Sequence, residues 1–288
     1  MHRMTSYAAA ALAAFMAASP AAAGADPVLA PSAEAKPGTR VEDRVVCANV
    51  MDAGAEAACG RLIQQNPDDA VAWFRRGAAL SYRGDYDRAI ADYDQGLKLD
   101  PNSAAAYHDR GDAWYNKADY DRAIADYDTA SALNPTKSID ALVRRARGRA
   151  YVAKGDYDRA IADLDEAIRL DADKLAYYVR GQAYYLKHDY DRAIADFDEA
   201  IQRDPKDARA YNNRGFAYEG KGAYARAIVD YDAALKLDPA LADARQNRDH
   251  ARASLAELRT AQGQEKTAPV QKTRGHSRWR LHSWHCGI

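Results

Sequence analysis

One eight-residue string recurs along this chain of 288 residues and constrains its fold more than any other feature. The string DYDRAIAD starts at Asp85, Asp119, Asp156 and Asp189, and a weaker copy, AYARAIVD, starts at Ala223. Successive copies lie 34, 37, 33 and 34 residues apart, with an Arg-Gly pair before each copy. A period of this length indicates a stack of similar supersecondary units that bury their apolar faces against one another.

Each unit has the pattern of two short helices. In the first unit, Trp73, Gly77 and Leu80 fall at i, i+4 and i+7, which places them on one helix face. Asp85 follows a glycine and is a good N-cap for a second helix. Pro101 ends that second helix, because proline cannot continue a helix that it would enter. The chain is therefore predicted to be a row of helix pairs.

The units resemble the tetratricopeptide repeat family. The family's fixed positions are filled in the first unit by Trp73, Gly77, Leu80, Tyr86, Ala89, Tyr93, Gly96 and Pro101, and in the second by Tyr107, Gly111, Trp114, Tyr120, Ala123, Tyr127, Ala130 and Pro135. The resemblance covers residues 70–241 and implies an all-α fold, a right-handed superhelical solenoid of antiparallel helix pairs. The five repeats are expected at 70–103, 104–137, 141–174, 174–207 and 208–241.

One departure from the family is systematic. The family commonly has leucine at the seventh position, whereas every copy here has arginine there and aspartate sixteen residues later. The arginine stem can replace leucine packing, but a partly buried guanidinium needs a carboxylate. We therefore predict a structural ladder, with a row of anion-binding arginines as the alternative. The pairs are Arg76–Asp92, Arg110–Asp126, Arg147–Asp163, Arg180–Asp196 and Arg214–Asp230.

The resemblance also implies a concave binding groove along the first helices of the repeats. These positions vary from copy to copy on a constant frame, as a binding surface requires, although unconstrained surface drift would give the same variation. The implied peptide-binding residues are Phe74, Ala78, Tyr82, His108, Asp112, Tyr115, Asn116, Arg145, Arg149, Tyr178, Gln182, Tyr185, Asn212, Phe216 and Glu219.

The third repeat is irregular, because the three residues 138–140 are inserted before it. Its Arg145 and Arg149 are four residues apart and therefore share one helix face. Two guanidiniums between the tyrosines of neighbouring repeats predict a site for a ligand carboxylate. A solvated basic turn is the alternative.

The first 25 residues predict a secretory signal peptide. A basic start at Arg3 precedes an uncharged run from Tyr7 to Ala18 and then small residues with the A-x-A spacing. An uncleaved alanine-rich helix is the alternative. Residues 26–40 contain three prolines and predict a flexible linker. The protein is accordingly expected to be periplasmic or secreted.

Residues 41–69 predict a degenerate N-terminal half repeat. Ala55, Cys59 and Leu62 fall on the family's positions for a second helix, and Cys47 lies in the stretch expected to form the first. Disulfides persist in proteins that mature outside the cytoplasm. We therefore predict a Cys47–Cys59 bond, worth roughly 3 kcal/mol in the chain-entropy model; two buried free thiols are the alternative.

The C-terminal part predicts a polar capping helix at 242–260, followed by a disordered basic tail at 261–288. Terminal repeats need a polar outer face for solubility. The tail ends with His282, His285 and Cys286, for which metal binding is a minor alternative to a solvated segment. No metal site is predicted.

Composition and motifs restrict the function. The net charge is −1 with both signs interspersed, which does not favour nucleic-acid binding. No phosphate loop, dinucleotide fingerprint or HExxH motif occurs, so neither a cofactor nor enzyme activity is expected. The favoured function is an exported scaffold or adaptor without a membrane span that binds a protein or peptide partner in its groove. The alternative is an accessory or regulatory subunit of a cell-envelope enzyme complex acting on cell-wall polymer.

Overall fold

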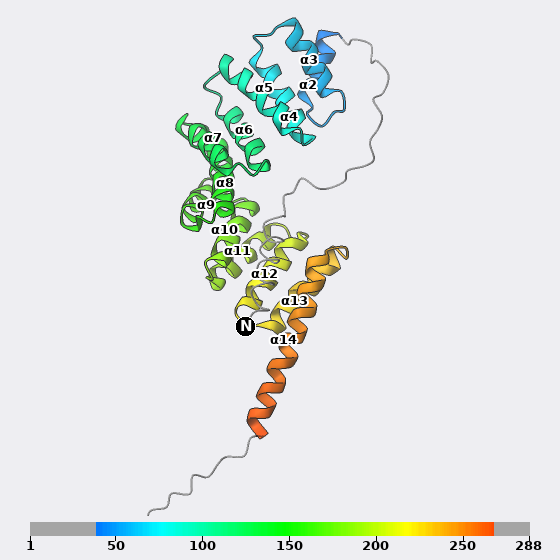
Figure 1. Cartoon of the computed structure of the whole chain (residues 1–288), viewed down its shortest axis with the longest axis vertical. Helices are drawn as coiled ribbons and strands as arrows, with labels where there is room; N and C mark the ends of the chain where they lie inside the picture. Colours follow the sequence, from blue (N-terminus) through cyan, green and yellow to red (C-terminus); the bar gives the residue numbers. More distant parts are fainter. Residues whose placement is uncertain (1–38, 268–288) are drawn as a thin grey trace, which may run out of the picture.

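The computed structural model of the chain describes residues 39–267, with side chains described up to Gln262. All thirteen elements of this part are α-helices, which confirms the predicted all-α repeat solenoid. The helices follow one another in antiparallel pairs along a curved path (Figure 1). They are α2 (Arg40–Ala48), α3 (Ala55–Gln65), α4 (Ala70–Tyr82), α5 (Tyr86–Leu99), α6 (Ala104–Asn116), α7 (Tyr120–Ala132), α8 (Lys137–Lys154), α9 (Tyr157–Leu170), α10 (Lys174–Leu186), α11 (Tyr190–Arg203), α12 (Ala208–Gly220), α13 (Tyr224–Leu237) and α14 (Ala242–Thr267).

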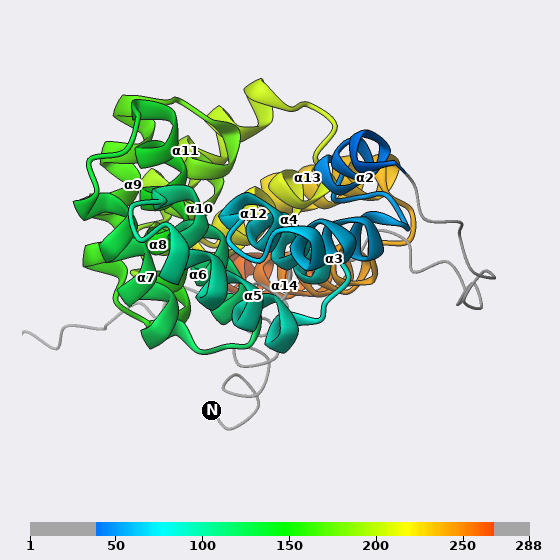
Figure 2. The same cartoon turned by 90° about the horizontal axis from the view of Figure 1, so that it is seen from above.

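The two helices of each repeat lie on different sides of the curve. Seen from above, the first helices α6, α8 and α10 lie on the inner side, and the second helices α7, α9 and α11 lie on the outer side (Figure 2). The inner side is where the sequence analysis places the groove. The predicted signal peptide, most of the predicted linker and the residues after 267 lie outside the described residues, as do the tail histidines and Cys286.

The recurring aspartate starts the second helix of each repeat. The side chain of Asp85 accepts a hydrogen bond from the backbone N–H of Arg88, and Asp119, Asp156 and Asp189 each cap a helix in the same way. Ala223 provides no side-chain cap for α13. The turn before Asp85 has one residue in the left-handed backbone conformation. Gly84 adopts it, with a φ of 82°.

Small residues and one large side chain pack each pair together. The alanine of the first turn of the second helix is fully buried in all five repeats, at Ala89, Ala123, Ala160, Ala193 and Ala227. The Tyr127 ring lies directly against Gly111, where an added Cβ would be 2.6 Å from its Cε1 atom. A close approach of this kind excludes any side chain at the glycine.

The arginine ladder is present in every repeat. Arg110 donates from Nε and Nη2 to the two carboxylate oxygens of Asp126 at 2.8 and 2.6 Å, and the same two-bond geometry recurs in the other four repeats. The aspartates are buried, at 3–8% exposed, so each one needs its arginine. These bonds confirm the predicted pairing of the two helices within a repeat.

The remaining nitrogen of the ladder arginine, Nη1, bonds to the preceding repeat. The sequence analysis did not predict this contact. Arg110 Nη1 donates to Asp94 at 2.5 Å, and the equivalent bonds are Arg147–Asp128, Arg180–Asp165 and Arg214–Asp198 at 2.6–2.7 Å. Arg248 of α14 continues the series with Asp232 at 3.2 Å. In the second to fifth repeats, one guanidinium therefore ties three helices together, whereas Arg76 of the first repeat bonds only to Asp92.

The residues inserted before the third repeat lengthen its first helix. The helix α8 has 18 residues, whereas α4, α6, α10 and α12 have 13 each. Thr136 caps α8, with its side chain accepting from the N–H of Ile139 at 3.5 Å. The insertion therefore adds a helical turn rather than a loop.

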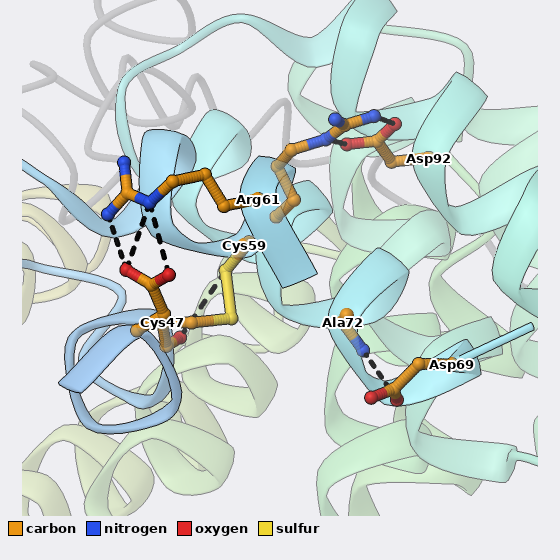
Figure 3. The surroundings of a disulfide bond; sticks show 8 residues. Cys47, Cys59, Arg61, Asp69, Ala72 and Asp92 are labelled. Atoms are coloured by element: carbon orange, nitrogen blue, oxygen red, sulfur yellow. Dashed lines mark hydrogen bonds and ion pairs between the residues drawn. A yellow bond between two sulfur atoms is a disulfide. The ribbon is translucent and has the colours of Figure 1, made fainter. Parts of the chain in front are cut away.

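The N-terminal half repeat is held by a disulfide and an ion pair. Cys47 of α2 and Cys59 of α3 are bonded, with their Cα atoms 4.9 Å apart, which confirms the predicted bond (Figure 3). Beside it, Arg61 Nε donates to both carboxylate oxygens of the buried Asp43 at 3.0 and 3.1 Å. The ladder pair is therefore reversed here, with aspartate on the first helix and arginine on the second.

The C-terminal helix is longer than predicted. It runs to Thr267, seven residues into the segment that we expected to be disordered. Residues 261–267 contain alanine, glutamine, glutamate and lysine, which are good helix formers, and no proline. Among the helices of residues 39–267, none combines the length and the apolar character needed to cross a membrane.

The ladder should carry much of the stability of each repeat. We expect Arg110→Ala to lower the free energy of unfolding by about 1–3 kcal/mol, because it leaves the buried Asp126 without its partner. Urea melts monitored by circular dichroism measure the change. Arg169→Ala is the control, because Arg169 is 67% exposed and pairs only with Glu166 on its own helix. A melt of Arg110→Ala equal to that of the control would contradict a structural ladder.

The disulfide should stabilise the half repeat. We expect Cys47→Ala with Cys59→Ala to lower the free energy of unfolding by about 3 kcal/mol, because a twelve-residue connection is no longer closed in the unfolded chain. Urea melts measure this, with Cys286→Ala as the control for removing one cysteine. Intact-mass analysis of the native protein after alkylation tests the bond itself. Modification of both cysteines without reductant would show that the bond is absent.

Candidate functional site

The predicted groove residues lie on consecutive first helices and differ in how far they reach solvent. Tyr82 at the end of α4 is 62% exposed, and Asn116 at the end of α6 is also exposed. Phe74 is partly buried instead, because its ring fills the space above Gly96 of α5. The row therefore combines surface positions with side chains that also belong to the core.

A polar cluster occupies the middle of the row. The buried Tyr127 donates its hydroxyl to Asp112 Oδ1 at 2.7 Å. Arg149 Nη2 of α8 donates to the same oxygen at 3.1 Å, and its guanidinium stacks on the Tyr115 ring at 4.0 Å. The structure thus brings three predicted residues, Asp112, Tyr115 and Arg149, into contact across two repeats. Tyr127 was expected only as a core residue.

His108 lies at the edge of this cluster. Its Nδ1 is 2.9 Å from Asp109 Oδ1, and its Nε2 is 3.9 Å from Asp112 Oδ2. Burial alone would lower the pKa of His108, but the Asp109 hydrogen bond and the two nearby carboxylates outweigh it and raise the pKa. Proton uptake at His108 is therefore favoured in the folded chain relative to the unfolded one.

The two arginines predicted to bind a ligand carboxylate are engaged by the chain itself. Arg145 forms an ion pair with Asp173, which precedes α10. Arg149 is held by Asp112 as described, and the charge of Asp112 opposes the effect of burial and raises its pKa. A ligand carboxylate would therefore have to displace an aspartate of this chain, and its binding there stays a prediction.

Amides and rings form the other end of the row. The hydroxyl of Tyr178 accepts a hydrogen bond from Asn213 Nδ2 at 2.7 Å, and Asn212 Oδ1 accepts one from Asn247 Nδ2 of α14 at 3.1 Å. Each of these bonds joins residues that are 35 apart in the sequence, the first residue lying at the fifth position of its repeat. The sequence analysis missed Asn213 and Asn247, although this constant offset identifies them.

Two further contacts complete that end. The rings of Tyr185 and Phe216 meet edge to face, with centroids 5.4 Å apart. Tyr231 donates its hydroxyl to Glu219 at 2.8 Å, and His250 of α14 pairs with the same carboxylate. The predicted residues Tyr178, Tyr185, Asn212, Phe216 and Glu219 thus belong to one connected surface over α10, α12 and α14. Ala78 and Gln182 lie in the same row, on α4 and α10.

The acidic side chains of this surface are paired with other groups of the chain. Its carboxylates accept hydrogen bonds from tyrosine or arginine, and residues 39–267 contain no group of three side chains able to hold a metal ion. The polar groups form pairs between neighbouring repeats, so the groove surface is built jointly by consecutive first helices.

Comparison with known sequences places most of this array in one family. Three family models, each described as tetratricopeptide repeat, match residues 70–103, 104–137, 145–207 and 208–241, which together make up more than half of the chain. Among curated proteins, no sequence is similar enough to this chain to count as a match.

Solved structures agree with the family models. The protein YrrB, described as a TPR protein with an unusual peptide-binding site, is 25% identical and aligns over 68% of this chain and 100% of its own, with a TM-score of 0.54. A MamA structure is 30% identical over 57% of this chain and 94% of its own, with a TM-score of 0.51. A tetratricopeptide repeat protein from Parabacteroides merdae shares the fold at 19% identity, with a TM-score of 0.62 over 79% of this chain and 91% of its own.

The raised pKa of His108 predicts a pH-dependent stability. Protonated His108 stabilises the folded state fully below the unfolded pKa of about 6.5, and this contribution is lost as the pH rises through the higher folded pKa. His108→Gln should therefore destabilise the protein more at about pH 5.5 than at about pH 8.5. Urea melts at both values measure the difference, with His188→Gln in an exposed turn as the control. If His108→Gln lowered the free energy of unfolding equally at both pH values, the prediction would be contradicted.

Proposed function

The chain belongs to the tetratricopeptide repeat family, and from this premise we propose that it is a scaffold whose concave groove binds a protein or peptide partner. The observation that carries the proposal is the contrast between frame and groove. The same arginine and aspartate bonds recur in every repeat, whereas the groove presents a histidine–aspartate cluster in one place and amides and rings in another. Differing side chains on a uniform frame are what selective recognition needs.

A related structure supports the proposal. YrrB, which aligns over its whole length at 25% identity, is described as having an unusual peptide-binding site. We infer that the corresponding inner face of this chain takes a peptide as well. Ring edges such as those of Tyr185 and Phe216 can contact apolar side chains. Amides such as Asn212 and Asn247 can exchange their mutual hydrogen bond for one to a peptide backbone.

We further infer that the protein has no catalytic activity and acts after export. The first inference is supported by the pairing of the groove carboxylates with other side chains of the chain, Asp112 with Tyr127 and Arg149, and Glu219 with Tyr231 and His250. The second is supported by the basic and apolar N-terminal sequence and by the Cys47–Cys59 bond. No specific observation favours the alternative of an accessory subunit acting on cell-wall polymer.

Site-specific crosslinking tests the groove. We expect a photoreactive phenylalanine analogue at Tyr82 to capture a partner in the envelope fraction, whereas the same analogue at Val229 of α13 captures none. The two positions are matched in exposure, at 62% and 67%, but only Tyr82 lies in the predicted groove. Capture from both positions, or from Val229 alone, would contradict binding through the groove.

A further inference from the structure

The helix α2 carries an apolar side that faces solvent. Val41, Val45 and Ala48 follow one another at i, i+4 and i+7, so they share one side of this helix. Val41 is 72% exposed and Val45 is 67% exposed, whereas Asp43 and Cys47 on the opposite side are buried. We call Val41, Val45 and Ala48 the α2 stripe.

Exposed apolar side chains are concentrated at this end of the array. Within residues 39–262, the most exposed large apolar side chains are Val41, Met51, Val45 and Val229, at 72%, 70%, 67% and 67%. Three of these four lie in α2 or in the turn that follows it. A single exposed valine such as Val229 is ordinary, but a group of exposed apolar side chains marks an interaction surface.

The first helices further along the array are covered by the repeat before them. Ala176, Val179 and Ala183 of α10 are buried in one cluster with Leu164 and Ala167 of α9. The helix α8 packs on α7 in the same way. In contrast, α2 is the first helix of the described residues and packs against α3 and α4, which follow it. The part of the chain that the structure describes therefore provides no helix to cover the α2 stripe.

The opposite end of the array is closed by a polar helix. The helices α2 and α14 lie at the two ends of the array (Figure 1). The exposed side chains in the first half of α14 are mostly polar and include Arg245, Asp249 and Arg252. Polar end faces keep repeat arrays soluble. The C-terminal end has such a face, whereas the α2 stripe leaves apolar surface in water at the other end.

Charges of opposite sign flank the α2 stripe. Since a helix turns by about 100° per residue, Arg40 and Arg44 lie along one edge of the stripe and Glu42 lies along the other, and all three are exposed. Two α2 helices packed in parallel through their stripes bring the arginine edge of each copy beside Glu42 of the other. Antiparallel packing would instead bring arginine edge to arginine edge. The charges therefore make the stripe complementary to a second, parallel copy of itself.

We propose that the α2 stripe joins two copies of this chain about a two-fold axis parallel to α2. Each copy contributes the same surface, so the contact closes after two copies and does not continue into a filament. Packing the valines of the two copies together removes their apolar surface from water. The contact uses none of the predicted groove residues, and it therefore goes beyond the partner binding proposed above.

Sedimentation equilibrium of the purified full chain tests the self-association. We expect a reversible monomer–dimer equilibrium between about 10 and about 500 μM, because a contact of one short helix per copy is small. Val41→Ser with Val45→Ser should weaken the association at least about tenfold, because less apolar surface is removed from water. Val229→Ser is the control, because Val229 is equally exposed but lies on α13, and it should leave the association unchanged.

The substituted valines are exposed, so the urea melts of these variants should match that of the parent. A chain that stays monomeric up to about 500 μM, well above the range of weak specific dimers, would overturn the proposal. So would a dimer that the Val41→Ser, Val45→Ser variant forms as strongly as the parent.

Cysteine bridging tests the orientation of the two helices. Val41→Cys and Ala48→Cys are made separately in a Cys286→Ala background and oxidised under mild conditions. A disulfide needs Cα atoms about 4.4–6.8 Å apart, and in the parallel arrangement both positions lie close to their own copies. Each variant should therefore form a bridged dimer on a non-reducing gel. A bridge that forms only when the two variants are mixed would show antiparallel packing and overturn the proposed arrangement.

Other covers for the α2 stripe would give different results. Residues 26–38 of the same chain, folded back onto the stripe, would leave a monomer that forms no bridged dimer. A lipid surface would leave a monomer in solution that floats with phosphatidylglycerol vesicles and no longer does so after Val41→Ser with Val45→Ser. Either result would overturn the pairing of two copies.

Discussion

The array depends on one guanidinium per repeat, which in the second to fifth repeats satisfies a buried carboxylate of its own repeat and a more exposed carboxylate of the preceding repeat. Removing charges from water is unfavourable unless all their hydrogen-bonding groups find partners. Arg110 meets that condition with two bonds to Asp126 and one to Asp94, and its guanidinium also lies over the Tyr107 ring at 5.3 Å. The carboxylate bonds raise the pKa of Arg110, so it stays charged. Stacking and pairing of helices are thus fixed by the same side chain.

This arrangement leaves the groove positions free to differ. A second series of ion pairs joins neighbouring repeats near the turn between the two helices of each repeat. Its members are Lys117–Asp87, Lys154–Asp121, Lys187–Asp158 and Lys221–Asp191. The arginine series and this one set the stack through bonds that lie outside the groove row. The first helices can therefore carry His108 in one repeat and Asn212 in another without a change in the frame.

The sequence predicted those features that recur within a repeat and missed those that form between repeats. The Arg110–Asp126 pair was found because both residues return at a fixed offset in every copy. Asp94 returns just as regularly, but its partner lies in the following repeat, where a search within one repeat does not find it. Arg149 pairs with Asp112 of the preceding repeat, and Arg145 pairs with Asp173 just before α10, so the spacing within α8 does not identify either partner.

The two ends of the solenoid differ in what they leave unsatisfied. The inner repeats bury small residues of their first helices completely, as at Ala183 and Ala217, whereas Val41 and Val45 of α2 are 72% and 67% exposed. The C-terminal end instead closes with α14, which continues the arginine series through Arg248. A ligand carboxylate at α8 would have to displace Asp112 from Arg149 or Asp173 from Arg145. The arginine series thus closes the stack at α14, whereas α2 leaves apolar side chains in contact with solvent, so the two ends of the array are not equivalent.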